Sequence, residues 1–160
     1  MNEIALKPIG VIHSPFKEAS GTPIQPCMAE GVKGHVEIFP EYQQGLADLD
    51  GFDRIWLLYW CHLAKTPKLM VKPFLDENEH GIFAVRAPSR PNPIGISCVK
   101  LLEVNGTSLQ VSDIDILDGT PLLDIKPYVV KFDCYDGLKC GWLDNVGKSK
   151  KSIADSRFEK

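Results

Sequence analysis

Two arginines and an asparagine stand in residues 86–95, a segment with the sequence Arg-Ala-Pro-Ser-Arg-Pro-Asn-Pro-Ile-Gly. Its three prolines fix φ and lack an N–H, so neither a helix nor a central strand can form there. Arg86, Arg90 and Asn92 therefore project from a backbone whose conformational entropy is low before folding. This segment, termed the proline shelf below, is suited to hold an anion or a flat ring.

A second group of polar side chains occupies residues 118–128, with the sequence Asp-Gly-Thr-Pro-Leu-Leu-Asp-Ile-Lys-Pro-Tyr. Asp118 and Gly119 predict a tight turn with exposed backbone amides. Alternation along a strand places Asp124, Lys126 and Tyr128 on one face, which sets an acid, a base and a phenol in a row. The alternative interpretation is an ion pair and a packed tyrosine on the wall of a barrel.

The chain lacks the sequence signatures of several common sites. It has no glycine-rich dinucleotide or phosphate loop and no His-Glu-x-x-His motif. The four histidines are scattered and the cysteines lack metal-ligand spacing, so we expect no metal site. Cys61 and His62 are neighbours in a predicted strand and point to opposite faces, which excludes a direct catalytic pair. His62 is then either an edge histidine or a site residue.

Composition indicates one globular domain without disulfides. The 160 residues are 44% hydrophobic, which suits a core that buries roughly 70% of the unfolded surface. Five cysteines, without a Cys-x-x-Cys pair or a signal peptide, indicate a reducing, cytoplasmic location. The longest apolar run, residues 55–61, is far shorter than the roughly 20 residues of a membrane span, so we expect no membrane association.

Charge argues against a strongly basic surface for nucleic acid. The chain has 18 basic and 21 acidic residues, which gives a net charge of −3. Local basic contacts are still compatible with this composition, on the proline shelf and at Lys148, Lys150 and Lys151 near the C-terminus. A solvated tail is the simpler interpretation of the three lysines.

The elements that must position these residues are mostly strands. Apolar patterning predicts strands over residues 5–13, 33–39, 52–61, 82–86, 96–104, 107–115 and 121–130. Residues 5–13 include a proline and predict an edge strand, whereas residues 52–61 are apolar on both faces and predict a buried central strand. Asn105 and Gly106 predict a type I′ hairpin turn.

A short helix is predicted over residues 40–47, with proline at its start. The loop at residues 14–32 is long enough to indicate a functional role, and residues 131–160 predict an irregular tail that is frayed or disordered over 149–158. Six or seven strands without βαβ alternation predict a mainly β fold, an antiparallel barrel that is closed or nearly closed. We expect a single domain over residues 1–160, with its core at about 4–130 and no separate C-terminal domain.

Taken together, the motifs resemble a known family. Arg86 with the Arg-Pro-Asn-Pro-Ile-Gly of the shelf, and the motifs at residues 118–121 and 124–128, are similar to segments of the TrmO or TsaA-like β-barrel methyltransferases. Segments at residues 9–17, 25–26 and 49–57 follow in the order of that family. The resemblance extends over most of the predicted core.

The resemblance implies an enzyme that uses S-adenosylmethionine to methylate N6 of N6-threonylcarbamoyladenosine, next to the anticodon of tRNA, and that forms a homodimer. Such a cofactor needs no phosphate-binding loop, which agrees with the missing glycine-rich motifs. Arg90 and Asn92 are expected to contact the RNA. The cofactor contacts implied by the resemblance are Gln25, Pro26, His62, Leu63, Arg86, Asp118, Gly119, Thr120 and Pro121.

The reaction centre is expected to include Asp118, Lys126 and Tyr128. The base that accepts the N6 proton stays open between Asp118, Asp124 and a Tyr128 polarised by Lys126. Two other functions also stay open: a methyltransferase of the same fold with a different adenine-containing or small-molecule acceptor, and a non-catalytic S-adenosylmethionine-binding module.

Overall fold

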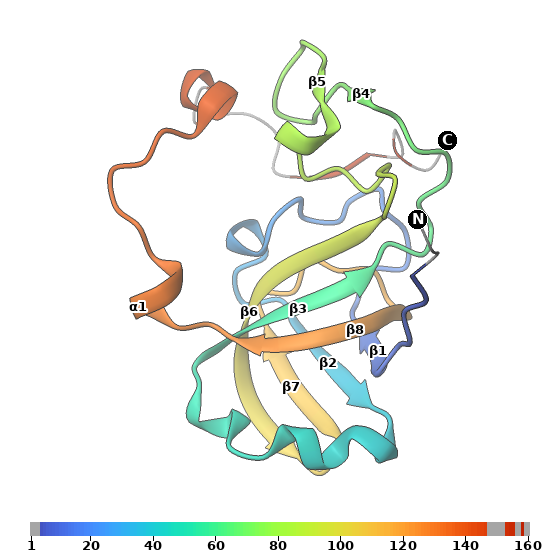
Figure 1. Cartoon of the computed structure of the whole chain (residues 1–160), viewed down its shortest axis with the longest axis vertical. Coiled ribbons are helices and arrows are strands. Elements are labelled where there is room, and N and C mark those ends of the chain that lie inside the picture. The colour runs from blue at the N-terminus through green and yellow to red at the C-terminus, as the bar shows by residue number, and fades with distance from the viewer. Residues whose placement is uncertain (1–3, 147–152, 156–157, 159–160) are drawn as a thin grey trace.

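The computed structural model describes residues 4–146, 153–155 and 158, and its centre is a closed antiparallel barrel (Figure 1). The strands are neighbours in the order β1-β2-β7-β6-β3-β8, and β8 pairs with β1 to close the barrel. They are β1 (Gly10–His13), β2 (Lys33–Ile38), β3 (Arg54–Trp60), β6 (Ile94–Asn105), β7 (Ser108–Ser112) and β8 (Thr120–Pro127). The mainly β barrel predicted from the sequence is confirmed, with six strands.

The other elements of the described chain are short. The predicted short helix with proline at its start is present as η2, wound as a 3-10 helix. The elements are η1 (Pro26–Met28), η2 (Pro40–Leu46), η3 (Leu49–Gly51), β4 (Met70–Val71), β5 (His80–Gly81), η4 (Ile82–Ala84), α1 (Val130–Asp133) and η5 (Gly141–Asn145).

Alternation along the barrel strands fills the interior with aliphatic side chains. Ile12, Val36, Ile55, Leu57, Val99, Leu109, Val111 and Leu122 are fully buried. The prediction that β3 is buried on both faces is wrong, because one face points inward, through Ile55, Leu57 and the partly buried Tyr59, while Trp60 is 36% exposed. The outer face of β3 is covered only in part, with Trp56 against the edge of Tyr128.

The predicted edge strand over residues 5–13 is wrong in extent and in kind. The strand is limited to Gly10–His13 and pairs with β2 on one side and β8 on the other. Closure of the barrel removes edges, so Pro8 stands before the strand rather than in it. Gly10 allows close pairing, since a Cβ there would lie 2.3 Å from the Glu37 carbonyl oxygen.

The hairpin between β6 and β7 is confirmed, but its turn differs from the predicted type I′ turn. Asn105 pairs with Ser108, which makes Gly106 and Thr107 the two loop residues. Gly106 has a φ of 60°, whereas Asn105 and Thr107 keep negative φ values. A glycine at the first loop position is typical of a type II′ turn.

Residues 61–93, termed the cap, lie over one end of the barrel (Figure 1). The strand predicted over residues 82–86 is absent, and Ile82–Ala84 form η4 instead. Arg90 explains this difference, because its Nη1 donates hydrogen bonds to the carbonyl oxygens of Ile82 at 3.0 Å and Val85 at 2.6 Å. The cap has a small core of Val71, Ile82 and Ala87, with Phe74 and Val85 beside them, and Phe158 of the C-terminal segment completes it.

The C-terminal part first leaves the barrel and then returns to the cap. Residues 129–141, termed the arm, run outside the barrel (Figure 1). Trp142 Nε1 then donates to the Ala84 carbonyl oxygen at 2.8 Å. The Ala154 backbone pairs with Gly21 and Thr22 of the 14–32 loop. The lysine cluster and most of the predicted frayed segment lie outside the described residues.

Candidate functional site

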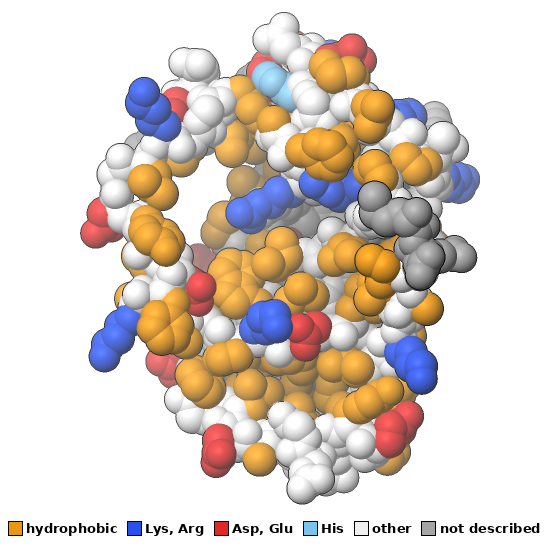
Figure 2. Space-filling model, in the orientation of Figure 1, with side chains coloured by type: hydrophobic (Ala, Val, Ile, Leu, Met, Phe, Trp, Pro, Cys, Tyr) orange, Lys and Arg blue, Asp and Glu red, His pale blue; other side chains and the backbone are white. Residues whose placement is uncertain are grey.

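A cavity of about 740 Å³ lies between the end of the barrel and the cap. The space-filling view shows this hollow, with hydrophobic, Lys and Arg side chains around it (Figure 2). The 14–32 loop, the cap, the start of β6 and the residues between β7 and β8 supply its wall. Its apolar lining includes Ile24, Phe74, Phe83, Ile94, Ile96 and Phe158.

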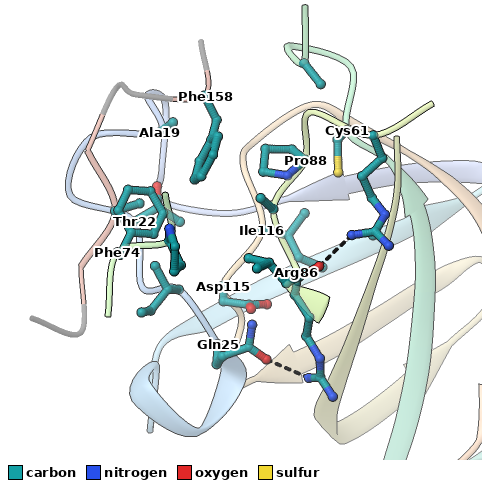
Figure 3. A pocket seen from close by; sticks show the side chains of 18 of the residues that line it. Ala19, Thr22, Gln25, Cys61, Phe74, Arg86, Pro88, Asp115, Ile116 and Phe158 are labelled. Atoms are coloured by element: carbon teal, nitrogen blue, oxygen red, sulfur yellow. Dashed lines mark hydrogen bonds between the residues drawn. The ribbon is translucent and has the colours of Figure 1, made fainter. Parts of the chain in front are cut away.

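Two segments predicted to bind the cofactor meet at this cavity. Arg86 Nη1 donates to Gln25 Oε1 at 2.7 Å, so the proline shelf contacts the 14–32 loop (Figure 3). Both side chains line the cavity, whereas Pro26 begins η1 and is not in the lining. A guanidinium in this position can bind an anion with its other N–H groups.

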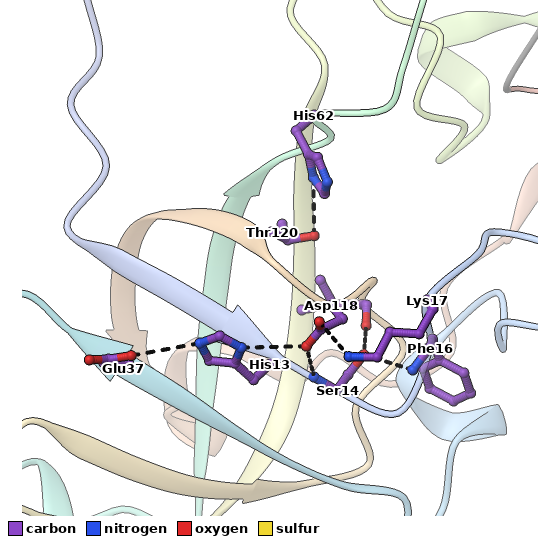
Figure 4. Close-up of polar contacts among 9 residues, drawn as sticks. His13, Ser14, Phe16, Lys17, Glu37, His62, Asp118 and Thr120 are labelled. Atoms are coloured by element: carbon purple, nitrogen blue, oxygen red, sulfur yellow. Dashed lines mark hydrogen bonds and ion pairs between the residues drawn. The ribbon is translucent and has the colours of Figure 1, made fainter.

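A second contact joins the end of β3 to the start of β8. Thr120 Oγ1 and His62 Nδ1 are 3.4 Å apart (Figure 4). Both residues line the cavity together with Leu63. Partial burial lowers the pKa of His62, because the charged imidazolium loses hydration there. His62 is therefore a neutral polar group at neutral pH, able to donate and accept hydrogen bonds.

Asp118 is the centre of an ion-pair network beside the cavity. Its carboxylate contacts Lys17 Nζ at 2.5 Å, the Ser14 amide at 3.1 Å and His13 Nδ1 at 3.4 Å (Figure 4). The hydrogen bond from Lys17 is the main reason why the pKa of Asp118 is lowered. Asp118 is an anion with several partners and does not line the cavity.

The turn at Asp118 does not offer the exposed amides predicted from the sequence. The Asp118 amide donates to the Phe16 carbonyl oxygen and the Gly119 amide to the Ile12 carbonyl oxygen. Gly119 adopts a φ of 74°, which glycine tolerates without strain. Neither Gly119 nor Pro121 is in the cavity wall, to which this turn contributes Thr120.

The two predicted substrate contacts differ in position. Arg90 lines the cavity, and its guanidinium lies 5.8 Å from the centre of the Phe83 ring while it fixes the cap carbonyls. Asn92 is exposed on the shelf and does not line the cavity.

Lys126 and Tyr128 lie outside the cavity. Lys126 Nζ contacts Asp124 Oδ2 at 2.9 Å, and the Tyr128 ring packs edge-on against Trp56 at 5.7 Å between centroids. The shared face predicted by alternation is therefore present, with the ion pair and packed tyrosine of the alternative interpretation. Their catalytic role stays a prediction.

Sequence reasoning missed a buried polar chain at the cavity. Ser97 Oγ donates to Asp115 Oδ1 at 2.6 Å and lies 3.1 Å from the Tyr59 hydroxyl. Asp115 and Tyr59 line the cavity (Figure 3 shows the Asp115 carboxylate beside Gln25 and Arg86). The available signal was an acidic residue between two isoleucines, just before the Asp118 turn.

The described residues contain no group of three or more His, Cys, Asp or Glu side chains arranged to hold a metal ion. All five cysteines are free thiols. Among the described helices, none is both long and apolar enough to span a bilayer.

Comparison with known proteins relates this site to a family. The family model described as tRNA-methyltransferase O N-terminal domain matches residues 11–134. A probable S-adenosyl-L-methionine-binding protein of Pyrococcus abyssi is 53% identical over 156 residues, 97% of this chain and 85% of that protein. The tRNA (adenine(37)-N6)-methyltransferase of Mus musculus is 37% identical over 136 residues, 79% of this chain and 31% of the mouse protein.

The fold is also that of solved structures. The crystal structure of TrmO from Pseudomonas aeruginosa matches with a TM-score of 0.75 at 36% identity, over 88% of this chain. The chain spans 63% of the length of that TrmO chain. On the family model, the relatives and the shared fold, this chain belongs to the tRNA-methyltransferase O family and contains its N-terminal domain.

Proposed function

We propose that the chain is an S-adenosylmethionine-dependent methyltransferase that methylates N6 of N6-threonylcarbamoyladenosine next to the anticodon of tRNA. The main observation in support is the cavity, because residues from distant parts of the sequence meet in its wall. These residues are Gln25, His62, Arg86 and Thr120. Family membership supports methyl transfer to tRNA, and the name of the mouse relative supports N6 of an adenine as the acceptor.

The cavity suits S-adenosylmethionine in size and in chemistry. Its volume of about 740 Å³ lies within the roughly 300–1,000 Å³ of small-molecule sites. Arg86 has five N–H donors and gives one bond to Gln25, so others can bind the carboxylate of the methyl donor. The apolar wall suits a purine ring. When bound, S-adenosylmethionine supplies a methyl group on a positively charged sulfur.

Most of the other residues predicted to bind the cofactor shape the backbone around the cavity in this proposal. Pro26 directs the chain that carries Gln25, while the Asp118–Lys17 ion pair and Gly119 fix the turn that carries Thr120. Pro121 continues this turn into β8, and Leu63 adds an apolar contact at the wall.

The RNA contacts are proposed to come from the shelf, through Arg90 and Asn92. Lys126 and Tyr128 stay predicted contributors to the reaction centre on the outer face of β8. The variants Lys126→Ala and Tyr128→Phe test this part separately, since wild-type turnover in both would exclude them from the reaction.

We further propose a homodimer that acts in the cytoplasm, where its tRNA substrate is found. The arm supports the homodimer, because it presents four large apolar side chains to solvent. These are Val130, Phe132, Tyr135 and Leu138, which are 66–74% exposed.

The test of the function is mass spectrometry of tRNA nucleosides after incubation with the purified protein and S-adenosylmethionine. Methylated N6-threonylcarbamoyladenosine is the expected product. Binding of S-adenosylmethionine without any product on tRNA would favour another acceptor or a non-catalytic binding module instead.

A further inference from the structure

The position of Asp115 is fixed by the segments on either side of it. Its neighbours Ile114 and Ile116 are buried in the barrel core, which directs the Asp115 side chain to the cavity. Asp113, with a φ of 65°, is held by Arg54 at 2.6 Å and by the Gly31 amide at 2.9 Å. The carboxylate of Asp115 therefore stands at a constrained point of the wall.

A hydrogen-bonded chain of two hydroxyl groups ends on this carboxylate. The Ser97 hydroxyl has one proton and donates it to Asp115 Oδ1 at 2.6 Å. Ser97 Oγ must then accept the proton of the Tyr59 hydroxyl, 3.1 Å away. Ser97 is 1% exposed, so the middle of this chain is closed to solvent. A carboxylate accepts about four hydrogen bonds, so Asp115 can also accept one from a ligand.

Tyr59 is itself tightly placed. Its ring lies against Gly95 of the proline shelf, where a Cβ atom would stand 2.2 Å from the ring. The shelf therefore positions the polar chain as well as its own arginines.

The charged and titratable groups around Asp115 leave its carboxylate able to accept a proton. Arg86 faces it and favours the carboxylate, whereas burial has the larger effect and raises the pKa of Asp115 to about 6. Burial also raises the pKa of the Tyr59 hydroxyl, and that of the Cys61 thiol to about 11, so both stay protonated at neutral pH. The other acidic residue of the wall, Asp155, is exposed.

We propose that Asp115 is the catalytic base of this enzyme and that Ser97 and Tyr59 are its positioning residues. This inference rests on the proposed function and names the proton acceptor for it. As the methyl carbon leaves the sulfonium sulfur and bonds to N6, the S–C electron pair stays on sulfur. The N6–H bond breaks, its electron pair forms the new N–C bond, and the proton passes to the Asp115 carboxylate. The carboxylic acid then releases the proton to water.

The three bases left open by the sequence, Asp118, Asp124 and Tyr128, fit this role less well. The pKa of Asp118 is lowered, and Lys17 holds its carboxylate outside the cavity wall. Asp124, which is ion-paired with Lys126, and Tyr128 are also outside the cavity wall. A base with a pKa of about 6, in contrast, is ionised at pH 7 and still basic enough to take a proton.

The test is the single-turnover rate of methyl transfer to threonylcarbamoylated tRNA between pH 5 and 8, at saturating S-adenosylmethionine. The wild-type rate is expected to rise with an inflection near pH 6. Asp115→Asn is expected to lower the plateau by roughly 10²–10⁴-fold and to remove this inflection, with unchanged affinity for S-adenosylmethionine by isothermal titration. Ser97→Ala is expected to move the inflection to higher pH, because the carboxylate loses a donor.

His62 is the control, because it is a second titratable side chain of the cavity wall and burial lowers its pKa. His62→Asn is expected to keep the inflection, whatever its effect on the plateau. A wild-type rate in Asp115→Asn, or an inflection lost only in His62→Asn, would overturn the role of Asp115. A correctly folded wild-type protein that methylates no tRNA would instead overturn the proposed function.

Discussion

At the scale of single residues, the site separates into charged groups with fixed partners and groups that face the cavity. Asp118 and Asp113 are ionised and held by Lys17 and Arg54, and their role is to set the shape of the backbone. Arg86 and Asp115 stand at the cavity wall, where a ligand can meet them. Sequence motifs alone do not distinguish the two kinds, because both are polar residues in loops.

Arg86→Ala is expected to weaken the binding of S-adenosylmethionine by roughly 10–100-fold. The reason is the loss of a charge-assisted hydrogen bond, worth about 1.5–3 kcal/mol. Isothermal titration measures this, with Lys100→Ala as the matched control because Lys100 is exposed and lies outside the cavity. Unchanged affinity in Arg86→Ala would remove this arginine from the cofactor site.

Asp115 is also expected to make stability depend on pH. Its folded-state pKa of about 6 lies above the ordinary aspartate value of 3.8. As pH rises, the unfolded chain therefore loses this proton first, and the rise in pH favours the unfolded state. Between about pH 4 and 6 the free energy of unfolding therefore falls by up to roughly 3 kcal/mol, and this stability is not regained above pH 6.

Urea unfolding at pH 7.5 therefore gives a more stable protein for Asp115→Asn than for the wild type, with a smaller difference at pH 4.5. Equal stability of the two proteins at both pH values would contradict the raised pKa.

At the scale of elements, the sequence pattern predicted the barrel strands well where alternation and turn chemistry agree. β2, the β6–β7 hairpin and β8 were predicted close to their observed positions. The strand predicted over residues 82–86 does not form. The Arg90 guanidinium binds the backbone carbonyls of this segment, and no local sequence pattern reveals this tertiary contact. Asp115 was missed for the same reason, since Ser97 is distant from it in sequence.

The proline shelf and β3 form one unit through Gly95 and Tyr59. Gly95→Ala is expected to displace the Tyr59 ring, to separate it from Ser97 and to cost about 1–3 kcal/mol in the free energy of unfolding. Urea unfolding measures the cost. Gly45→Ala is the matched control, because a Cβ at Gly45 meets no atom within 4 Å. Equal effects of the two substitutions would show that the Gly95 contact is unimportant.

At the scale of the whole molecule, a barrel, a cap and a returning C-terminal segment enclose one cavity. The barrel end supplies Asp115 and Thr120, the cap supplies Arg86 and His62, and the C-terminal segment contributes Phe158 to the wall. The arm lies outside this enclosure, and its exposed apolar side chains do not line the cavity.

If the arm binds a second copy, charges placed on it should produce a monomer. Phe132→Glu combined with Leu138→Glu is expected to convert a wild-type dimer into a monomer in size-exclusion chromatography with light scattering. Leu69→Glu, a charge on an equally exposed leucine of the cap, is the control and should leave the dimer intact. A dimer that survives the arm substitutions would place the interface elsewhere.

The proposed reaction transfers a methyl group to N6 of threonylcarbamoyladenosine in tRNA. Trideuteromethyl-labelled S-adenosylmethionine, incubated with the wild-type protein and tRNA either carrying or lacking the threonylcarbamoyl group, tests it by nucleoside mass spectrometry. We expect labelled methyl on N6 of threonylcarbamoyladenosine, with none on the unmodified tRNA and a strongly reduced yield from Arg86→Ala. Absence of label from the modified tRNA, with a folded protein that binds S-adenosylmethionine, would contradict it.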